Sequence, residues 1–335
     1  MDRQTTDAAG KSRALRVGIL SAFLIFTAAA MIGSLIFGSA DIAFGRILAT
    51  LFGPVTGTDG TVIWNIRFPR NLTGALVGAD LAVSGAILQA VMKNPLADPG
   101  IVGVSSGAGL AGVVMLIFLP EAALLLTPVA FLGAMASAGA VYVLAWKNGI
   151  RPSRIILAGI AVSAFLGSGI SALLVFYADR VQGALLWMVG GLSARSWPQV
   201  YALFPYTVLG LALAFCGAKA LNILSLGDET ARGLGLPVEK VRFLMTAVAA
   251  LLAAGAVSIA GLIGFVGLVV PHIVRLLIGS DYKYLIPGSA LLGAGVLVLC
   301  DTVGRIIVAP VEIPAGILMA FLGAPFFLYL LRRNV

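Results

Sequence analysis

Long apolar segments alternate with short polar connections along most of the chain. A helix needs roughly 20 mostly apolar residues to cross the hydrocarbon core of a bilayer, and by this criterion the pattern predicts about ten spans. The spans cover residues 15–38, 66–92, 100–118, 124–146, 155–177, 200–218, 243–263, a short span broken by Pro271, 285–308 and 313–331. We therefore expect an all-α integral membrane protein, with a tail at residues 1–14 and a single transmembrane domain at residues 15–335.

The composition places most of the chain's apolar surface in lipid. Hydrophobic residues make up 60% of the 335 residues and charged residues only 11%, whereas a soluble domain carries about 25% charged residues. This balance excludes a soluble enzyme, a secreted disulfide scaffold and a disordered regulator. The first apolar run exceeds the roughly 7–15 residues of a signal peptide's apolar region, so we expect it to be retained as the first span.

The distribution of lysine and arginine predicts the orientation. With the N-terminus in the cytoplasm, 16 of the 22 basic residues fall inside and the other six fall outside, which agrees with the positive-inside rule. An even number of spans then places both termini in the cytoplasm, together with a loop at residues 218–242. The net charge of +8 follows from basic loops that face anionic lipid headgroups, so it indicates no nucleic-acid partner.

Motifs of catalytic and nucleotide-binding sites are absent from the sequence. It contains no phosphate-binding G-x-x-x-x-G-K-[ST], no H-E-x-x-H, no G-x-G-x-x-G after a predicted strand and no G-x-S-x-G elbow between a strand and a helix. One histidine, His272, and two distant cysteines offer no metal-ligand spacing. We expect no catalytic residue, metal or cofactor in this chain, which favours a transporter or channel driven by an ion gradient or by another protein.

Asp80 is the clearest ionisable residue within a predicted span. A carboxylate inside the bilayer must be paired, neutral or in contact with water. Three interpretations stay open: a structural hydrogen bond between helices, a position that lines a pathway, or coupling to a proton or another cation. Asp301 and Glu312 fall near the outer ends of the last two spans, where we expect water to reach them.

Glycine is abundant, with 41 residues, and several glycines lie four positions apart within spans. Gly74 with Gly78 and Gly103 with Gly107 are the clearest pairs. Small residues at this spacing let helix backbones approach closely where lipid gives no hydrophobic drive for association. The spacing predicts a tightly packed helical bundle.

Three segments carry longer motifs. They read RFPR at 67–70 with NPLADPGIVGVSSG at 94–107, LGDETARGLGLP at 226–237, and GLIGFVGLVVPHIVR at 261–275 with PVEIPAG at 310–316. Together they resemble the permease family of type II ABC importers, which takes up iron–siderophore complexes, haem and vitamin B12. The resemblance runs in the same order through nearly the whole chain after the first span.

This resemblance implies a transport assembly. Its parts would be a homodimer with ten spans per subunit around a central pathway, two cytoplasmic ATPase subunits that hold ATP and Mg²⁺, and an extracytoplasmic substrate-binding protein. The assembly would lie in the bacterial cytoplasmic (inner) membrane, in contact with membrane lipid. No catalytic residue and no cofactor would belong to this chain.

The resemblance also implies roles for three arginines at the outer face. Arg67, Arg70 and Arg305 would dock acidic side chains of the binding protein, because arginine forms bidentate pairs with carboxylates. Anchoring at lipid headgroups is the alternative. On the docking interpretation, Arg70→Glu should weaken docking and leave the fold intact.

Two further groups of residues would act at the cytoplasmic face. Glycines in the loop at 218–242 bound a short predicted helix, which by resemblance would sit in a cleft of the ATPase and transmit its closure. The coupling residues would be Leu226, Gly227, Asp228, Glu229, Arg232, Gly233 and Gly235. The cytoplasmic gate would be formed by Asn94, Leu96 and Ser153, although Pro152 stands where the vitamin B12 permease has a hydroxyl residue. Simple helix-terminating turns are the alternative.

The sequence therefore favours the membrane subunit of an ATP-driven importer. Iron–siderophore uptake is the commonest role in the family and is our first expectation, with haem or vitamin B12 as alternatives. A secondary, ion-coupled carrier is the alternative of another class, and Asp80 is its best support.

Overall fold

The computed structural model of the protein describes residues 13–38, 57–147 and 149–334, together with Gly45, Ile47, Thr50 and Gly53. Most of the predicted tail at residues 1–14 therefore lies outside the described residues. The same holds for Arg46, one of the six basic residues expected outside.

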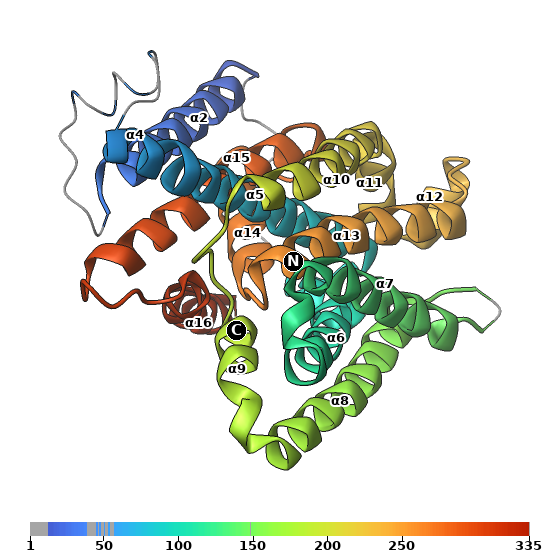
Figure 1. The fold of residues 1–335 in the computed structure, drawn as a ribbon. Coiled ribbons are helices and arrows are strands. Elements are labelled where there is room, and N and C mark those ends of the chain that lie inside the picture. Colours follow the sequence, from blue (N-terminus) through green and yellow to red (C-terminus); the bar gives the residue numbers. More distant parts are fainter. Residues whose placement is uncertain are drawn as a thin grey trace.

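Regular structure in the described residues is helical throughout (Figure 1). Seven stretches are long and apolar enough to cross a membrane. They are α2 (Arg13–Ile36), the continuous rod of α4 (Gly57–Val62), η2 (Ile63–Arg67) and α5 (Phe68–Val91), η4 (Pro120–Leu125) with α7 (Leu126–Ala145), α8 (Pro152–Phe176), α10 (Trp197–Cys216), α13 (Val238–Ala260) and α15 (Tyr282–Ile306). The shorter apolar helices are α6 (Val104–Phe118), α14 (Val266–Ile278) and α16 (Ala315–Asn334). These ten elements match the predicted spans in order.

Short elements connect these spans. They are η3 (Pro99–Val102), η5 (Ala178–Arg180), α9 (Val181–Val189), α11 (Ala218–Ser225) and α12 (Asp228–Gly233). The loop predicted at 218–242 is thus largely helical: it contains α11, α12 and the first turn of α13. The short helix expected within it is confirmed as α12.

The bundle is built around α5, which crosses its centre (Figure 1). In the most apolar window of this span 89% of the residues are buried, compared with 17% in α8. Helices α13, α14 and α15 pack directly on α5, and α8 lies at the periphery (Figure 1).

Glycine permits the close packing of the centre. A Cβ at Gly78 would lie 2.2 Å from the carbonyl oxygen of Gly293 on α15, and one at Gly85 would lie 1.9 Å from that of Gly267 on α14. Similarly, a Cβ at Gly107 on α6 would lie 2.3 Å from the carbonyl oxygen of Gly133 on α7. Real side chains do not approach so closely, so these helices meet backbone to backbone, as the glycine spacing predicted.

Helix α14 differs from the prediction of a span broken by Pro271. The helix continues through this proline, although the ring removes the hydrogen bond to the carbonyl of Gly267 one turn earlier. The side chain of Gln89 on α5 compensates by donating to the carbonyl oxygens of Gly267 and Leu268, both at 3.4 Å. A neighbouring helix therefore stabilises the turn that proline weakens.

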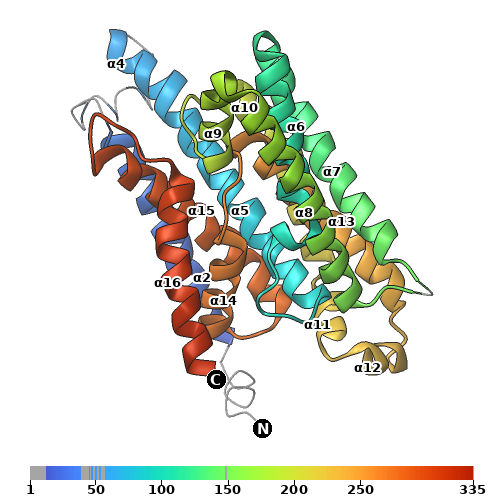
Figure 2. The same cartoon turned by 90° about the horizontal axis from the view of Figure 1, so that it is seen from below.

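The bundle has two distinct ends (Figure 2). One end, which we call the α12 end, contains α11, α12, the turn between α5 and α6, the start of α2 and the C-terminal end of α16. The opposite end, the α9 end, contains α4, η2, α9 and the loop between α15 and α16.

Candidate functional site

A cluster of arginines and carboxylates lies at the α9 end. Arg70, in the first turn of α5, donates from Nε and Nη2 to the two carboxylate oxygens of Asp301 on α15, both at 2.9 Å. Its Nη1 donates to Glu312 Oε2, in the loop before α16, also at 2.9 Å. One guanidinium therefore joins two helices and a loop through a bidentate pair and a second ion pair. We call Arg70, Asp301, Arg305 and Glu312 the arginine cluster.

The other two predicted docking arginines also point into the protein. Arg305 Nη2 donates to Ser34 Oγ at 2.7 Å, and Arg305 Nε lies 3.3 Å from Asp301 Oδ2. Arg67 Nη1 donates to the carbonyl oxygen of Leu35 at 2.7 Å. Both arginines thus tie the C-terminal end of α2 to the rest of the bundle.

Burial in this cluster changes two expectations. Asp301 is only 4% exposed, so the prediction that water reaches it is wrong; paired arginines, not water, compensate its charge. Arg67, Arg70 and Arg305 are 5%, 8% and 5% exposed. Their docking role stays a prediction, but Arg70→Glu would place a third carboxylate among two others, so an intact fold is not expected for this variant.

Glu312 and Arg195 are partly exposed residues of this end. Ser193 Oγ donates to Glu312 Oε2 at 2.9 Å. Burial raises the pKa of the Glu312 carboxyl, but Arg70, Ser193 and Arg305 outweigh this and leave the pKa below its usual value. Burial and the nearby charge of Arg70 lower the pKa of Arg195. No acceptor for the Arg195 guanidinium occurs among the described residues. Sequence reasoning missed Arg195, because nothing in its neighbourhood along the chain distinguishes it.

At the α12 end, buried charge attaches the short helix to the bundle. Arg242 on α13 is completely buried. Its Nη2 donates to Asp228 Oδ1 at 2.7 Å and its Nη1 to the carbonyl oxygen of Ile150 at 2.8 Å. Lys93 forms a second ion pair with Asp228, and Arg232 pairs with Glu239 at 2.9 Å. The start of α12 is therefore joined to α13 and to the turn after α5.

The remaining surface of α12 is open. Leu226 and Leu234 are each 61% exposed. Gly227 and Gly235 adopt φ angles of 115° and 80°, which glycine accepts without strain. The exposed members of the predicted coupling set are Leu226, Glu229, Arg232, Gly233 and Gly235. The two exposed leucines beside this polar, glycine-bounded helix leave apolar side chains available for contact with another protein.

Asp228 gives this attachment a dependence on pH. Burial raises the pKa of its carboxyl, but hydrogen bonds and charges from Arg242 and Lys93 outweigh burial and hold the pKa below its usual value. A carboxyl with a depressed folded pKa contributes stability above its unfolded pKa and loses it as the pH falls through the folded pKa. Below about pH 4 we therefore expect the melting temperature to fall more steeply for the wild type than for Asp228→Asn.

Melting curves of the purified protein between about pH 3 and pH 7 measure this difference, with Glu229→Gln, an exposed neighbour on α12, as the control. Parallel pH profiles for the wild type and Asp228→Asn would contradict the proposed attachment.

The predicted gate residues lie on two separate turns of the α12 end. Asn94 Oδ1 accepts a hydrogen bond from the backbone N–H of Leu96 at 2.9 Å, and Ser153 is exposed in the first turn of α8. Pro152 occupies the first position of α8, a place that suits proline because no helical donor is lost there. No hydrogen bond joins Ser153 to the other turn in the part of the chain that the structure describes, and the gate stays a prediction.

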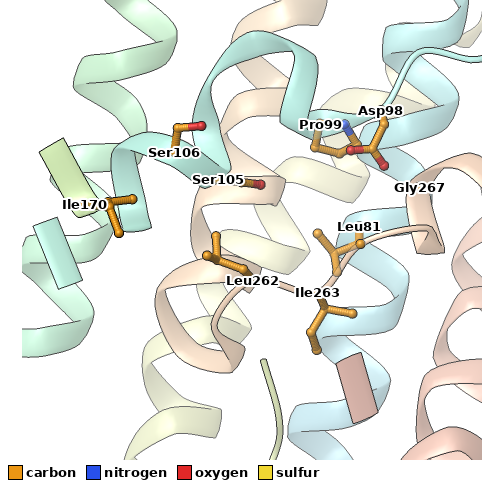
Figure 3. A pocket seen from close by; sticks show the side chains of 10 residues that line it. Leu81, Asp98, Pro99, Ser105, Ser106, Ile170, Leu262, Ile263 and Gly267 are labelled. Atoms are coloured by element: carbon orange, nitrogen blue, oxygen red, sulfur yellow. The ribbon is translucent and has the colours of Figure 1, made fainter. Parts of the chain in front are cut away.

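A cavity of about 320 Å³ lies among the spans (Figure 3). It is bounded by Leu81 of α5, Asp98 and Pro99 at η3, Ser105 and Ser106 of α6, Ile170 of α8, and Leu262, Ile263, Gly264 and Gly267 before and within α14. Its lining combines apolar side chains with the hydroxyl groups of Ser105 and Ser106 and the carboxyl group of Asp98. The side chain of Asp98 caps η3 by accepting from the N–H of Gly100 at 2.8 Å. The lining can offer hydrogen bonds and apolar contact, and among the described residues no hydrogen bond joins Ser105 or Ser106 to Asp98.

Asp80 lies outside this lining and is completely buried. Its Oδ2 accepts a hydrogen bond from Thr207 Oγ1 of α10 at 2.7 Å, and its Oδ1 has no partner among the described residues. Of the three interpretations, this arrangement fits a structural hydrogen bond between α5 and α10 best, and a pathway position in this conformation least.

Substitutions at the contact between Asp80 and Thr207 distinguish a structural role of Asp80 from a role in transport. Asp80→Asn keeps the shape and the contact with Thr207, so we expect near-wild-type stability and uptake. Thr207→Val leaves both Asp80 oxygens without a partner and should cost about 1–3 kcal/mol of stability. Ser168→Ala, an exposed hydroxyl bonded within its own helix, is the control. Normal melting with abolished uptake in Asp80→Asn would instead indicate a pathway or ion-coupling role.

Known proteins share both the sequence and the fold. Residues 24–333 match the FecCD transport family. The Fe(3+)-citrate import system permease protein YfmD of Bacillus subtilis (strain 168) is 42% identical over 297 residues, covering 89% of each chain. The cobalamin import system permease protein BtuC of Halobacterium salinarum is 46% identical over 280 residues, covering 83% of this chain and 75% of that protein.

A solved structure agrees with this match. It is an ABC transporter chain in an inward-facing conformation, of metal-chelate type by its description, and it superimposes with a TM-score of 0.84 at 29% identity, covering 94% of this chain and 99% of that one. Sequence and fold lead to the same group of proteins. The chain therefore belongs to the FecCD transport family, as the multi-pass permease subunit of a bacterial ABC importer in the group that serves iron chelates, haem and vitamin B12, with no catalytic site or cofactor of its own.

Proposed function

We propose that this permease imports iron–siderophore complexes or a closely similar iron chelate. The identity with the Fe(3+)-citrate permease over most of both chains is the observation that supports an iron cargo. The cargo passes between two copies of the permease while partner ATPases drive alternating access. Vitamin B12 is the second candidate, because the cobalamin permease of Halobacterium salinarum shares 46% identity over a shorter region. Haem is a third candidate within the family, and no single contact in the structure favours it.

The two ends take different partners in this proposal. The α12 end faces the cytoplasm and binds the ATPase through α12, whose exposed leucines and charges are held in place by Asp228 and Arg242. The Asn94–Leu96 turn and Ser153 form the gate on the same side. The α9 end faces the substrate-binding protein. Membership in this family of ABC importer permeases argues against the alternative that the protein is a secondary, ion-coupled carrier.

Docking at the α9 end involves competition for Arg70. Asp301 and Glu312 already occupy its donors, so an acidic side chain of the binding protein must displace the half-exposed Glu312 or use another cation. Arg195 is suited to the second route, because its guanidinium lacks an acid partner in the described structure. Arg67 and Arg305 contribute mainly by fixing the end of α2.

A second copy covers α8 in this proposal. This helix is the least buried of the long spans, and Leu157, Ile160 and Phe165 on it are exposed. The cavity beside Ile170 then opens toward the interface between the two copies.

ATP hydrolysis by the permease–ATPase complex tests the cargo. Binding protein loaded in turn with a ferric hydroxamate, ferric citrate, haem or cobalamin is added, and hydrolysis is compared with that for unloaded protein. Stimulation by one iron chelate above the others is the expected result. Stimulation by cobalamin or haem alone would overturn the iron assignment and leave the importer class intact.

A further inference from the structure

We propose that a groove between α7 and α10 is a binding site for one acyl chain of a membrane phospholipid. The groove has a volume of about 530 Å³, within the range of specific small-molecule sites. Its lining residues are Thr127, Pro128, Phe131 and Leu132 of α7, Tyr201, Ala202, Leu203, Pro205 and Tyr206 of α10, and Gly255, Ser258 and Ile259 of α13.

The groove lies where α7 and α10 both pack on α13, and Figure 1 shows these three helices. Gly255 contributes no side chain to the floor of the groove, and a Cβ there would lie only 3.1 Å from Leu203 Cδ1. Ser258 Oγ donates to the carbonyl oxygen of Gly255 at 2.9 Å, so this hydroxyl is satisfied within its own helix. The ring centroids of Phe131 on α7 and Tyr206 on α10 lie 5.1 Å apart. The floor and walls therefore suit a hydrocarbon chain more than a polar ligand.

The groove is continuous with the surface that faces lipid. Leu132 and Tyr201 on its rim are 64% and 68% exposed, and Phe204 beside it on α10 is also exposed. In a multi-pass membrane protein, exposed apolar side chains along a span meet lipid acyl chains wherever no other subunit covers them. A chain lying in the groove would bury these walls without any change in the fold.

An aromatic cluster marks one end of the groove as the level of the lipid headgroups. Trp197 lies 5.5 Å from Trp64, 5.7 Å from Phe68 and 5.6 Å from Tyr201, measured between ring centroids. Trp197 Nε1 donates to the carbonyl oxygen of Trp64 at 2.9 Å. Tryptophan and tyrosine concentrate where membrane meets water. Tyr201 belongs to this cluster and also lines the groove, so a lipid anchored here would extend its chain from the α9 end into the groove.

Native mass spectrometry of the importer complex extracted from vesicles of palmitoyl-oleoyl phosphatidylcholine tests the site. We expect phospholipid to stay bound to the wild type and to be lost from Ala202→Phe, which fills the groove from its exposed wall. Ala212→Phe, the same change at an exposed position of α10 outside the lining, should retain it. Equal retention in both variants, or detergent in place of phospholipid in the wild type, would overturn the proposal.

A measurement on the unaltered protein avoids dependence on variant folding. Vesicles that contain phosphatidylcholine with a photoactivatable diazirine in one acyl chain are irradiated, and labelled peptides are mapped. Adducts concentrated in residues 127–132 and 201–206 are expected. Adducts spread evenly over all lipid-exposed helices, or adducts missing from residues 127–132 and 201–206, would contradict a lipid site.

Discussion

Arg70→Gln is expected to leave little stably folded permease. Arg70 holds Asp301 and Glu312 together, and Asp301 is nearly inaccessible to water. Removing one partner of a buried ion pair costs about 3–5 kcal/mol, and we expect the lower part of this range because Arg305 Nε stays 3.3 Å from Asp301 Oδ2. A typical domain is stable by only about 5–15 kcal/mol, so this single change removes a large share. Arg70→Glu should destabilise the fold further, since it adds a third carboxylate beside Asp301 and Glu312.

Thermal unfolding of the detergent-purified protein, together with the folded yield, measures this loss. Arg180→Gln is the matched control, because Arg180 is exposed and its ion pair, at 3.7 Å, is with the adjacent Asp179. The melting temperature of Arg70→Lys should fall between those of the wild type and Arg70→Gln, because lysine keeps the charge but cannot form the bidentate pair. An unchanged melting temperature for Arg70→Gln would show that the arginine cluster does not support the fold.

Replacing both exposed leucines of the α12 region should abolish binding of the ATPase. Leu226 and Leu234 are each 61% exposed and flank a helix held rigidly by Asp228. Fully burying one leucine contributes about 1.5–3 kcal/mol, so losing two should weaken the complex by roughly 100-fold or more. Since neither side chain belongs to the core, Leu226→Ser with Leu234→Ser should leave thermal stability unchanged.

Co-purification of the ATPase with the permease measures this effect. Leu124→Ser is the matched control: Leu124 is 91% exposed in η4, which precedes α7 at the opposite end of the bundle. The control should keep the ATPase. If the double variant keeps it as well, the ATPase binds elsewhere and α12 is not the coupling element.

The spans were predictable because their signal is local. A run of apolar residues long enough to cross a bilayer can satisfy its backbone only as a helix, so ten such runs give ten helices. The short helix α12 was also predictable, because Gly227 and Gly235 bound it in the sequence. Glycine spacing indicated close contacts, although it could not say which helix each glycine meets.

Contacts between distant segments could not be predicted from these patterns. Asp301 looked accessible because it lies near a span end, but Arg70, which is 231 positions away in the sequence, pairs with its carboxylate. The hydrogen-bond partner of Asp80 could not be identified because Thr207 lies 127 positions away. Pro271 looked like a break because the compensating donor, Gln89, belongs to another helix. In each case the polar partner is fixed by tertiary packing, which neither span length nor local motif encodes.

ATP dependence of uptake tests the central claim most directly. Liposomes that contain the permease with its ATPase receive substrate-binding protein and a radiolabelled iron chelate outside, with or without enclosed ATP. Proton and sodium gradients are applied in separate samples. The account predicts accumulation of the chelate only with ATP and binding protein present, independent of either gradient. Accumulation that follows an ion gradient without ATP would contradict it.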